Sequence, residues 1–133
     1  MGHSAGGFSS LFASSYMHFG VRAVINFAGG RGAKGSNAIC SEQALVNSLS
    51  YAGKTSRVPS MWIYNENDKA FSPMLAQSML DAFTKSGGQG ELRILPPFQN
   101  DGHRLFSDIR GISIWKPIVE DFLKKMGMCP LCQ

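Results

Sequence analysis

The feature that most constrains this chain is a regular alternation of strand-like and helix-like segments. Three short runs have the length and apolar content of strands: residues 21–27, 58–64 and 91–95. Helical periodicity lies between and around them, over about residues 6–18, 41–51, 72–85 and 115–126. Strands that alternate with helices form a parallel sheet with crossover helices, so we expect an α/β fold with about three parallel strands.

Composition limits the class of protein and its partners. The 133 residues suit one domain, and a chain that is 44% hydrophobic and 17% charged is apolar enough to bury a core. No apolar run is long enough to cross a bilayer, so no membrane partner is expected. The formal charge is +4, but Lys and Arg are scattered, which argues against nucleic-acid binding. The oligomeric state and the compartment are not indicated.

The cysteines give a weaker signal. Cys40 stands alone in mid-chain, while Cys129 and Cys132 form C-P-L-C in the last five residues. Two thiolates at this spacing are half of a common zinc site, but no second Cys/His pair completes it. We therefore expect no metal or other cofactor. We place the domain at residues 1–126, with residues 127–133 as a tail that carries the C-x-x-C pattern. A thiol- or metal-binding module using this tail remains an alternative.

The chain opens with M-G-H-S-A-G-G, which contains the pattern G-x-S-x-G. A chain with this Gly and Ser content meets that pattern by accident roughly one time in five, so the pattern alone is weak. A nucleophilic serine stands on a sharp strand-to-helix turn whose neighbours must be small, as Gly2, Ala5, Gly6 and Gly7 are. Ser4 is therefore the candidate nucleophile, and the backbone N–H of Ala5 is a candidate oxyanion donor at a helix N-terminus.

A serine nucleophile needs a histidine base and a carboxylate that orients the base. In the strand-turn-helix arrangement the order along the chain is Ser, then Asp or Glu, then His. Asp68 follows the strand that ends near residue 64, and His103 lies in the loop after the strand that ends near residue 95. Both follow strands, so both are expected at the carboxyl edge of the parallel sheet, where Ser4 also stands.

Other acids and histidines compete for these roles. Glu66 and Asp101 are rival acids, and Asp101 is the more serious one because it is two residues from His103. His3 is the variable residue of the serine motif itself. His18 is expected at a helix end, where a cation is favourable without any function.

Four segments resemble the C-terminal half of α/β-hydrolases of the dienelactone hydrolase family: GHSAGG, VRAVINFAGGRG, MWIYNEND and PPFQNDGHRLF. The resemblance covers residues 1 to about 125. It implies a partial α/β-hydrolase fold, with Ser4 as nucleophile, Asp68 as orienting acid and His103 as general base and acid. The enzyme that gives the family its name uses a cysteine nucleophile, whereas this chain has a serine at that position. The resemblance therefore implies a serine hydrolase whose substrate is a small-molecule ester, lactone or related acyl compound rather than dienelactone itself.

The resemblance also implies a missing part. Family members carry a strand-rich half before the serine motif, which supplies the strand leading to the nucleophile and a second oxyanion donor. We therefore expect a truncated form with little or no activity, in which the strand at 21–27 lacks a sheet neighbour and Ser4 sits on a frayed terminus. A non-catalytic hydrolase remnant is the main alternative.

The loop Gly30–Gly35 formally matches the dinucleotide pattern G-x-G-x-x-G after a strand. A dinucleotide site would need the last glycine inside a helix and an acid about 20 residues further on, and the sequence near Thr55 has none. The expected structure is a solvated loop, with Arg31 or Lys34 binding an anionic substrate group as an alternative.

Overall fold

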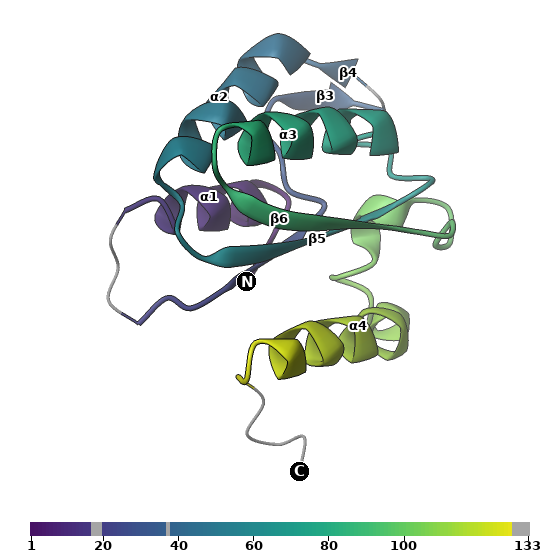
Figure 1. The fold of residues 1–133 in the computed structure, drawn as a ribbon. Helices are drawn as coiled ribbons and strands as arrows, with labels where there is room; N and C mark the ends of the chain where they lie inside the picture. The colour runs from purple at the N-terminus through teal and green to yellow at the C-terminus, as the bar shows by residue number, and fades with distance from the viewer. Residues whose placement is uncertain (17–19, 37, 129–133) are drawn as a thin grey trace.

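The computed structural model describes residues 1–16, 20–36 and 38–128, and within them four strands form one parallel sheet (Figure 1). The strands lie side by side in chain order: β1 (Gly2–His3), β2 (Val24–Phe27), β5 (Pro59–Asn65) and β6 (Gln89–Leu95). Every neighbouring pair is parallel, as expected when helices connect the strands. The predicted α/β architecture is confirmed, with four strands where the sequence indicated about three.

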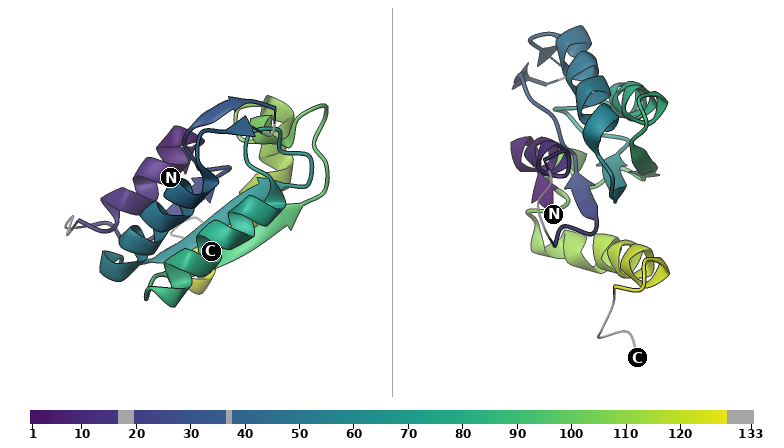
Figure 2. Two further views of the ribbon diagram at one scale, coloured as in Figure 1. Left: turned by 90° about the horizontal axis from the view of Figure 1, so that it is seen from above. Right: turned by 60° about the vertical axis from the view of Figure 1, so that its left-hand side comes forward.

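Helices cover both faces of the sheet. They are α1 (Ala5–Ala13), α2 (Glu42–Thr55), α3 (Pro73–Lys85) and α4 (Ile112–Lys125). Strands that advance in one direction across a sheet, with crossovers of one hand, place their connecting helices on one face. Accordingly, α1, α2 and α3 pack on one face and α4 packs on the other (Figures 1 and 2).

The core is divided between the two faces by the alternation of side chains along each strand. Val24 and Trp62 pack beneath α1, α2 and α3, whereas their strand neighbours Ile25 and Met61 pack against α4. All four side chains are buried. Because both faces are covered, the central strands carry nearly continuous apolar runs rather than alternating ones, which is why the sequence pattern identified them.

The short strand β1 changes the expectation for the edge of the sheet. Gly2 pairs with Asn26, and His3 pairs with Phe27. The prediction that the strand at 21–27 lacks a neighbour on this side is therefore wrong at Asn26 and Phe27. Among the described residues, Val24 has no partner in β1. Two residues suffice for this pairing because the serine turn that follows them is anchored to the same strand.

Helix α1 is shorter than predicted. Ser14 Oγ donates to a carbonyl of the preceding turn at 2.6 Å, and Ser15 Oγ donates to the Ala52 carbonyl of α2 at 3.0 Å. The Ser14 hydroxyl thus satisfies a carbonyl in the last turn of α1, and the Ser15 hydroxyl attaches the end of this helix to α2. Tyr16, which falls within the helix expected over about residues 6–18, lies beyond the end of α1 and is 63% exposed. His18 lies outside the described residues.

Local signals place the start of α2 and α3 correctly. Ser41 and Ser72 each accept a backbone N–H of the first turn, at 3.1 and 3.2 Å, and Pro73 occupies the first helical position of α3. Helix α2 continues past its predicted end and includes Gly53. A β-carbon there would overlap the Phe83 carbonyl of α3, so this glycine permits close packing of the two helices rather than ending one.

The glycine-rich loop after β2 contains a small hairpin that the sequence did not predict. Strand β3 (Ala33–Gly35) pairs antiparallel with β4 (Ala38–Ile39). The chain after Gly35 thus runs into a strand instead of the helix that a dinucleotide site needs. Arg31 and Lys34 are exposed, and Arg31 lines a hollow of about 350 Å³ beside α1 and α2.

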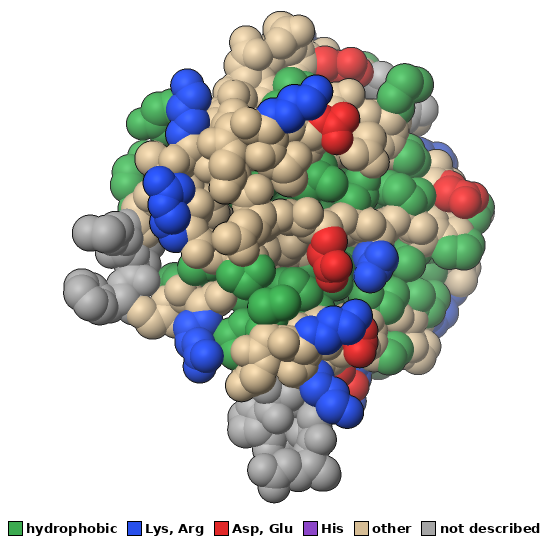
Figure 3. All heavy atoms as spheres, viewed as in Figure 1, with side chains coloured by type: hydrophobic (Ala, Val, Ile, Leu, Met, Phe, Trp, Pro, Cys, Tyr) green, Lys and Arg blue, Asp and Glu red, His purple; other side chains and the backbone are tan. Residues whose placement is uncertain are grey.

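The surface carries charges of both signs. Figure 3 shows Lys and Arg side chains spread over one face with Asp and Glu side chains among them. Within the described ranges, no helix is both long and apolar enough to cross a bilayer, and no three His, Cys, Asp or Glu side chains gather as metal ligands. Cys40 is exposed. Cys129 and Cys132 lie outside the described residues, so the tail and its thiol alternative stay predictions.

Candidate active site

Ser4 occupies a sharp turn between β1 and α1. Its φ of 54° and ψ of −124° belong to a region that a non-glycine residue adopts only when the surrounding structure imposes it. The Ser4 N–H donates to the Phe27 carbonyl at 2.9 Å. The Ser4 carbonyl accepts the N–H groups of Phe8 and Gly30, at 3.1 and 3.2 Å. The expectation of a frayed terminus at Ser4 is therefore wrong, because these bonds hold a strained turn in place.

Close packing around the turn explains two of the glycines in the motif. A β-carbon at Gly2 would overlap the Gly6 carbonyl, and one at Gly7 would overlap the side chain of Asn26. Gly6 itself has open space where a β-carbon would stand. The predicted need for small residues thus arises from the contact of β1 with α1 at Gly2 and of α1 with β2 at Gly7.

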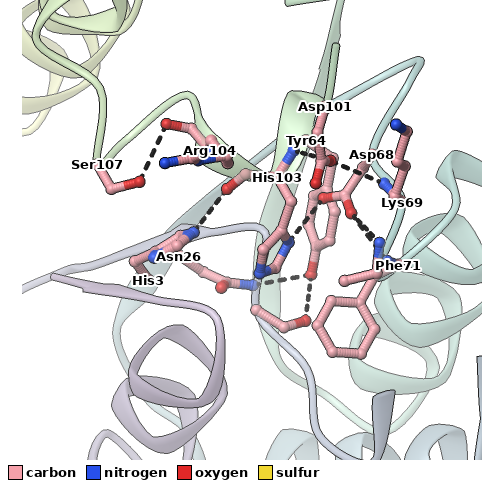
Figure 4. A network of polar contacts seen from close by, with 12 residues as sticks. His3, Asn26, Tyr64, Asp68, Lys69, Phe71, Asp101, His103, Arg104 and Ser107 are labelled. Atoms are coloured by element: carbon pink, nitrogen blue, oxygen red, sulfur yellow. Dashed lines mark hydrogen bonds and ion pairs between the residues drawn. The ribbon is translucent and has the colours of Figure 1, made fainter. Parts of the chain in front are cut away.

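Asp68 lies in the turn between β5 and α3, and its side chain is buried. One carboxylate oxygen, Oδ1, accepts the backbone N–H groups of Ala70 and Phe71, both at 2.8 Å. The other oxygen, Oδ2, lies 3.2 Å from His103 Nδ1 (Figure 4). The backbone bonds fix the direction of the carboxylate, so that one oxygen faces the imidazole.

The rival acids occupy other positions. Asp101 Oδ1 accepts the backbone N–H groups of His103 and Lys69, at 3.0 and 3.1 Å, and so supports the loop rather than the imidazole (Figure 4). Glu66 is exposed. Of the three acids considered, the structure brings Asp68 to the histidine ring.

His103 is carried by a short 3₁₀ turn, η1 (Gly102–Arg104), in the loop after β6. Asn67 clamps this loop: its Oδ1 accepts the Phe98 N–H at 2.9 Å, and its carbonyl accepts the Gly102 N–H at 3.2 Å. A β-carbon at Gly102 would overlap Asn65, so the loop approaches the end of β5 as closely as the backbone allows. This close approach is what places His103 beside Asp68.

His3 makes a contact that the sequence did not predict. Its Nε2 lies 2.7 Å from the His103 carbonyl oxygen, and the two imidazole rings lie 4.9 Å apart between centroids (Figure 4). Phe106 lies against the His3 ring at 5.7 Å. Burial lowers the pKa of His3. The one sequence signal for these contacts was the position of His3, directly before the candidate nucleophile.

Hydrogen bonds of the buried Tyr64 hydroxyl support the segment that holds the Ser4 turn. Tyr64 Oη donates to the Gly29 carbonyl at 2.6 Å and accepts from Asn26 Nδ2 at 3.3 Å (Figure 4). Burial raises the pKa of Tyr64 well above its usual value, which keeps the phenol neutral and able to donate. The Tyr64 hydroxyl thus fixes the backbone at Gly29, and the N–H of the next residue, Gly30, donates to the Ser4 carbonyl.

The structure thus brings Asp68 and His103 into direct contact and brings His103 against His3, the neighbour of Ser4. Among the hydrogen bonds of the described residues, none joins the Ser4 hydroxyl to the His103 imidazole. Such nucleophile–base contacts are often long in ligand-free structures and tighten when substrate binds. Ala5 is the first residue of α1, so its N–H has no partner within the helix.

Comparisons with known proteins identify the fold. The sequence matches no family model and no curated protein. The structure is similar to that of a protein from Klebsiella pneumoniae assigned as a dienelactone hydrolase, with a TM-score of 0.64 and 12% identity over 96% of this chain. It is also similar to two crystal forms of an esterase from Pyrococcus furiosus. Their TM-scores are 0.65 and 0.60, with 14% and 12% identity over 93% and 94% of this chain.

The similarity extends over part of each solved structure. This chain spans 50% of the Klebsiella protein and 51–52% of the Pyrococcus esterase. The expected partial α/β-hydrolase fold, like that of dienelactone hydrolases, is therefore confirmed at the level of the fold.

Proposed function

We propose that this chain carries the serine site of a hydrolase that acts on an ester, lactone or related acyl compound. The observation that carries the proposal is the contact of the buried Asp68 with His103, whose carbonyl contacts His3, the residue before a serine held in a strained turn. The solved structures with a similar fold are described as a dienelactone hydrolase and an esterase, which agrees with this chemistry. In the proposed site, Ser4 is the nucleophile, His103 the base and Asp68 the orienting acid.

The tautomer of His103 follows from its contact with Asp68. A carboxylate only accepts hydrogen bonds, so it selects the tautomer in which His103 Nδ1 carries the proton. Nε2 is then free to take the proton of the Ser4 hydroxyl as Ser4 Oγ attacks the substrate carbonyl. The imidazolium formed in this step is stabilised by Asp68, and it returns the proton to the leaving group as the carbon–oxygen bond breaks. Water then attacks the acyl-enzyme by the same route.

Charge on the attacked carbonyl oxygen would be stabilised at the start of α1. The free N–H of Ala5 and the positive end of the helix dipole both favour an oxyanion there. A site of this kind commonly uses two backbone donors, and removing one costs about 10²–10³ in rate. With one donor identified, we expect slow turnover and a reactive serine, so covalent labelling is a better assay than turnover.

Labelling with a fluorophosphonate tests the proposal. Ser4 Oγ would form a bond to phosphorus, fluoride would leave, and His103 would take the hydroxyl proton. We expect the full chain to gain one phosphonate, located on Ser4 by peptide mass spectrometry, and the Ser4→Ala variant to gain none. Ser9→Ala is the matched control, because Ser9 is an exposed serine on the same helix.

Two outcomes would count against the proposal. Labelling that persists in Ser4→Ala would show that another group reacts. A folded chain that resists labelling at every concentration would favour the alternative, a hydrolase remnant that keeps the residues without their reactivity.

A further inference from the structure

His3 joins the strand that bears the candidate nucleophile to the loop that bears the candidate base. The acceptor of its 2.7 Å hydrogen bond is the carbonyl oxygen of His103 itself. A carbonyl cannot donate, so Nε2 of His3 must carry the proton. The bond therefore defines the tautomer of His3 and attaches its ring to the backbone of the 3₁₀ turn η1.

The surroundings of His3 favour its neutral form. Burial is the main cause that lowers its pKa, and the facing His103 lowers the pKa further. The hydrogen bond to the His103 carbonyl and the charge of Asp68 act in the opposite direction. The neighbouring Phe106 contributes no charge. A neutral ring here avoids repulsion when His103 takes up a proton during catalysis, because two cations at this spacing would oppose each other.

His103 is held from two sides. Asp68 Oδ2 contacts the imidazole at Nδ1, and His3 holds the carbonyl of the same residue. His3 is adjacent to Ser4, and β1 is anchored to β2 through the pairing of His3 with Phe27. A shift of η1 relative to the sheet would therefore stretch or break the hydrogen bond to His3.

We propose that His3 is a positioning residue that fixes His103 relative to Ser4 through its hydrogen bond to the His103 carbonyl. This inference rests on the proposed function for its catalytic meaning. The contact itself stands on geometry alone, so the two can fail separately.

Two variants separate the donor from the ring. In His3→Gln the side-chain Nε2 is the same number of bonds from Cα as Nε2 of histidine, so the donor is retained without a titratable group. In His3→Phe the ring is retained and the donor is lost. We expect the maximal rate of phosphonate labelling to fall about 10-fold or more in His3→Phe, since small misplacements of catalytic groups have effects of up to about 10². The half-saturating probe concentration should stay the same, and His3→Gln should recover most of the rate.

If wild type is labelled, an equal labelling rate in His3→Phe would overturn the proposal, because the ring would then act by packing alone. A loss of rate in His3→Gln as large as in His3→Phe would overturn it as well, because the donor would then be irrelevant. Urea unfolding of both variants accompanies the assay and identifies any loss of folded protein.

Imidazole nitrogen NMR gives a readout that needs no reactivity. We expect His3 in the Nε2–H form, and a downfield Nδ1–H signal of His103 that persists in His3→Gln and is lost in His3→Phe. If wild type resists labelling while these signals behave as expected, the proposed function fails and the positioning contact stands. An unchanged His103 signal in His3→Phe would overturn the positioning role regardless of labelling.

Discussion

At the scale of single residues, each proposed catalytic group depends on a neighbour that fixes its geometry. Ser4 is held in its strained turn by Phe27 and Gly30, and the two oxygens of Asp68 serve different partners. The sequence identified these side chains from their order and their places after strands. It favoured Asp68 and kept Asp101 as a rival, because the contact that decides between them depends on how two loops, distant in the chain, pack together.

Asp68→Asn should impair the base while leaving the turn intact. The amide oxygen of Asn can still accept the N–H groups of Ala70 and Phe71, but its NH₂ would then face His103 Nδ1. That contact favours the wrong tautomer, with the proton on Nε2, and in a comparable serine site it lowers the rate by about 10⁴. We expect a loss of about 10³–10⁴ in the phosphonate labelling rate of Ser4.

The control for this prediction is Asp81→Asn on the exposed side of α3. It removes the same charge far from the imidazole and should label at the wild-type rate. An Asp68→Asn protein that labels as fast as Asp81→Asn would exclude Asp68 as the orienting acid.

The stability of the protein should fall at mildly acidic pH because of His3. Its pKa in the folded protein lies below its ordinary value of 6.5, so the unfolded chain binds more protons than the folded one between the two pKa values. Stability attributable to His3 is therefore complete above about pH 6.5 and declines as the pH falls through this window. Urea unfolding at several pH values should show a smaller acidic decline in His3→Gln, and an identical decline in both proteins would refute the assignment.

At the scale of secondary-structure elements, local chemistry determines where some helices begin. Ser72 accepts the Leu75 N–H, and Pro73 fits the first helical position. Replacing Ser72 by Ala should lower the free energy of unfolding by about 1 kcal/mol. The control Ser78→Ala lies on the exposed side of the same helix, and the better helix propensity of Ala should leave stability unchanged or slightly higher. Urea unfolding of the two variants measures the difference, and equal stabilities would show that the cap contributes nothing.

Elements were predictable where such local signals act and unpredictable where tertiary contacts decide. The start of α3 follows from Ser72 and Pro73 alone. The early end of α1 depends on contacts with α2 that include Ser15, and β1 exists because two residues find partners on β2. Neither contact leaves a periodic pattern in the sequence, and the same holds for the hairpin of β3 and β4.

At the scale of the whole molecule, stability should be highest at the centre of the sheet. Strand β5 has partners on both sides, whereas β1 and β6 lie at the two edges. Both faces of β5 are covered, by α1, α2 and α3 on one side and by α4 on the other. Native-state hydrogen exchange should therefore find the slowest amides in β5 and the fastest strand amides in β1. Exchange in β1 as slow as in β5 would mean that an unseen contact protects this edge.

The arrangement of layers also explains how distant residues reach one site. Parallel strands end at the same edge of the sheet, so the segments after β1, β5 and β6 converge there, as the stick view of the contacts around His103 shows (Figure 4). The sequence predicted this convergence from the alternation of elements alone. It could not predict the close approach of the last two loops, which depends on Asn67 and Gly102.

A crystal structure of the phosphonate-treated chain tests most directly whether three distant side chains form one reactive site. We expect phosphorus bonded to Ser4 Oγ, a phosphoryl oxygen on the Ala5 N–H, and His103 Nε2 within about 3.2 Å of an adduct oxygen while Nδ1 stays on Asp68. An adduct on another residue, or an imidazole turned away from Ser4 in the bound state, would contradict the proposed site.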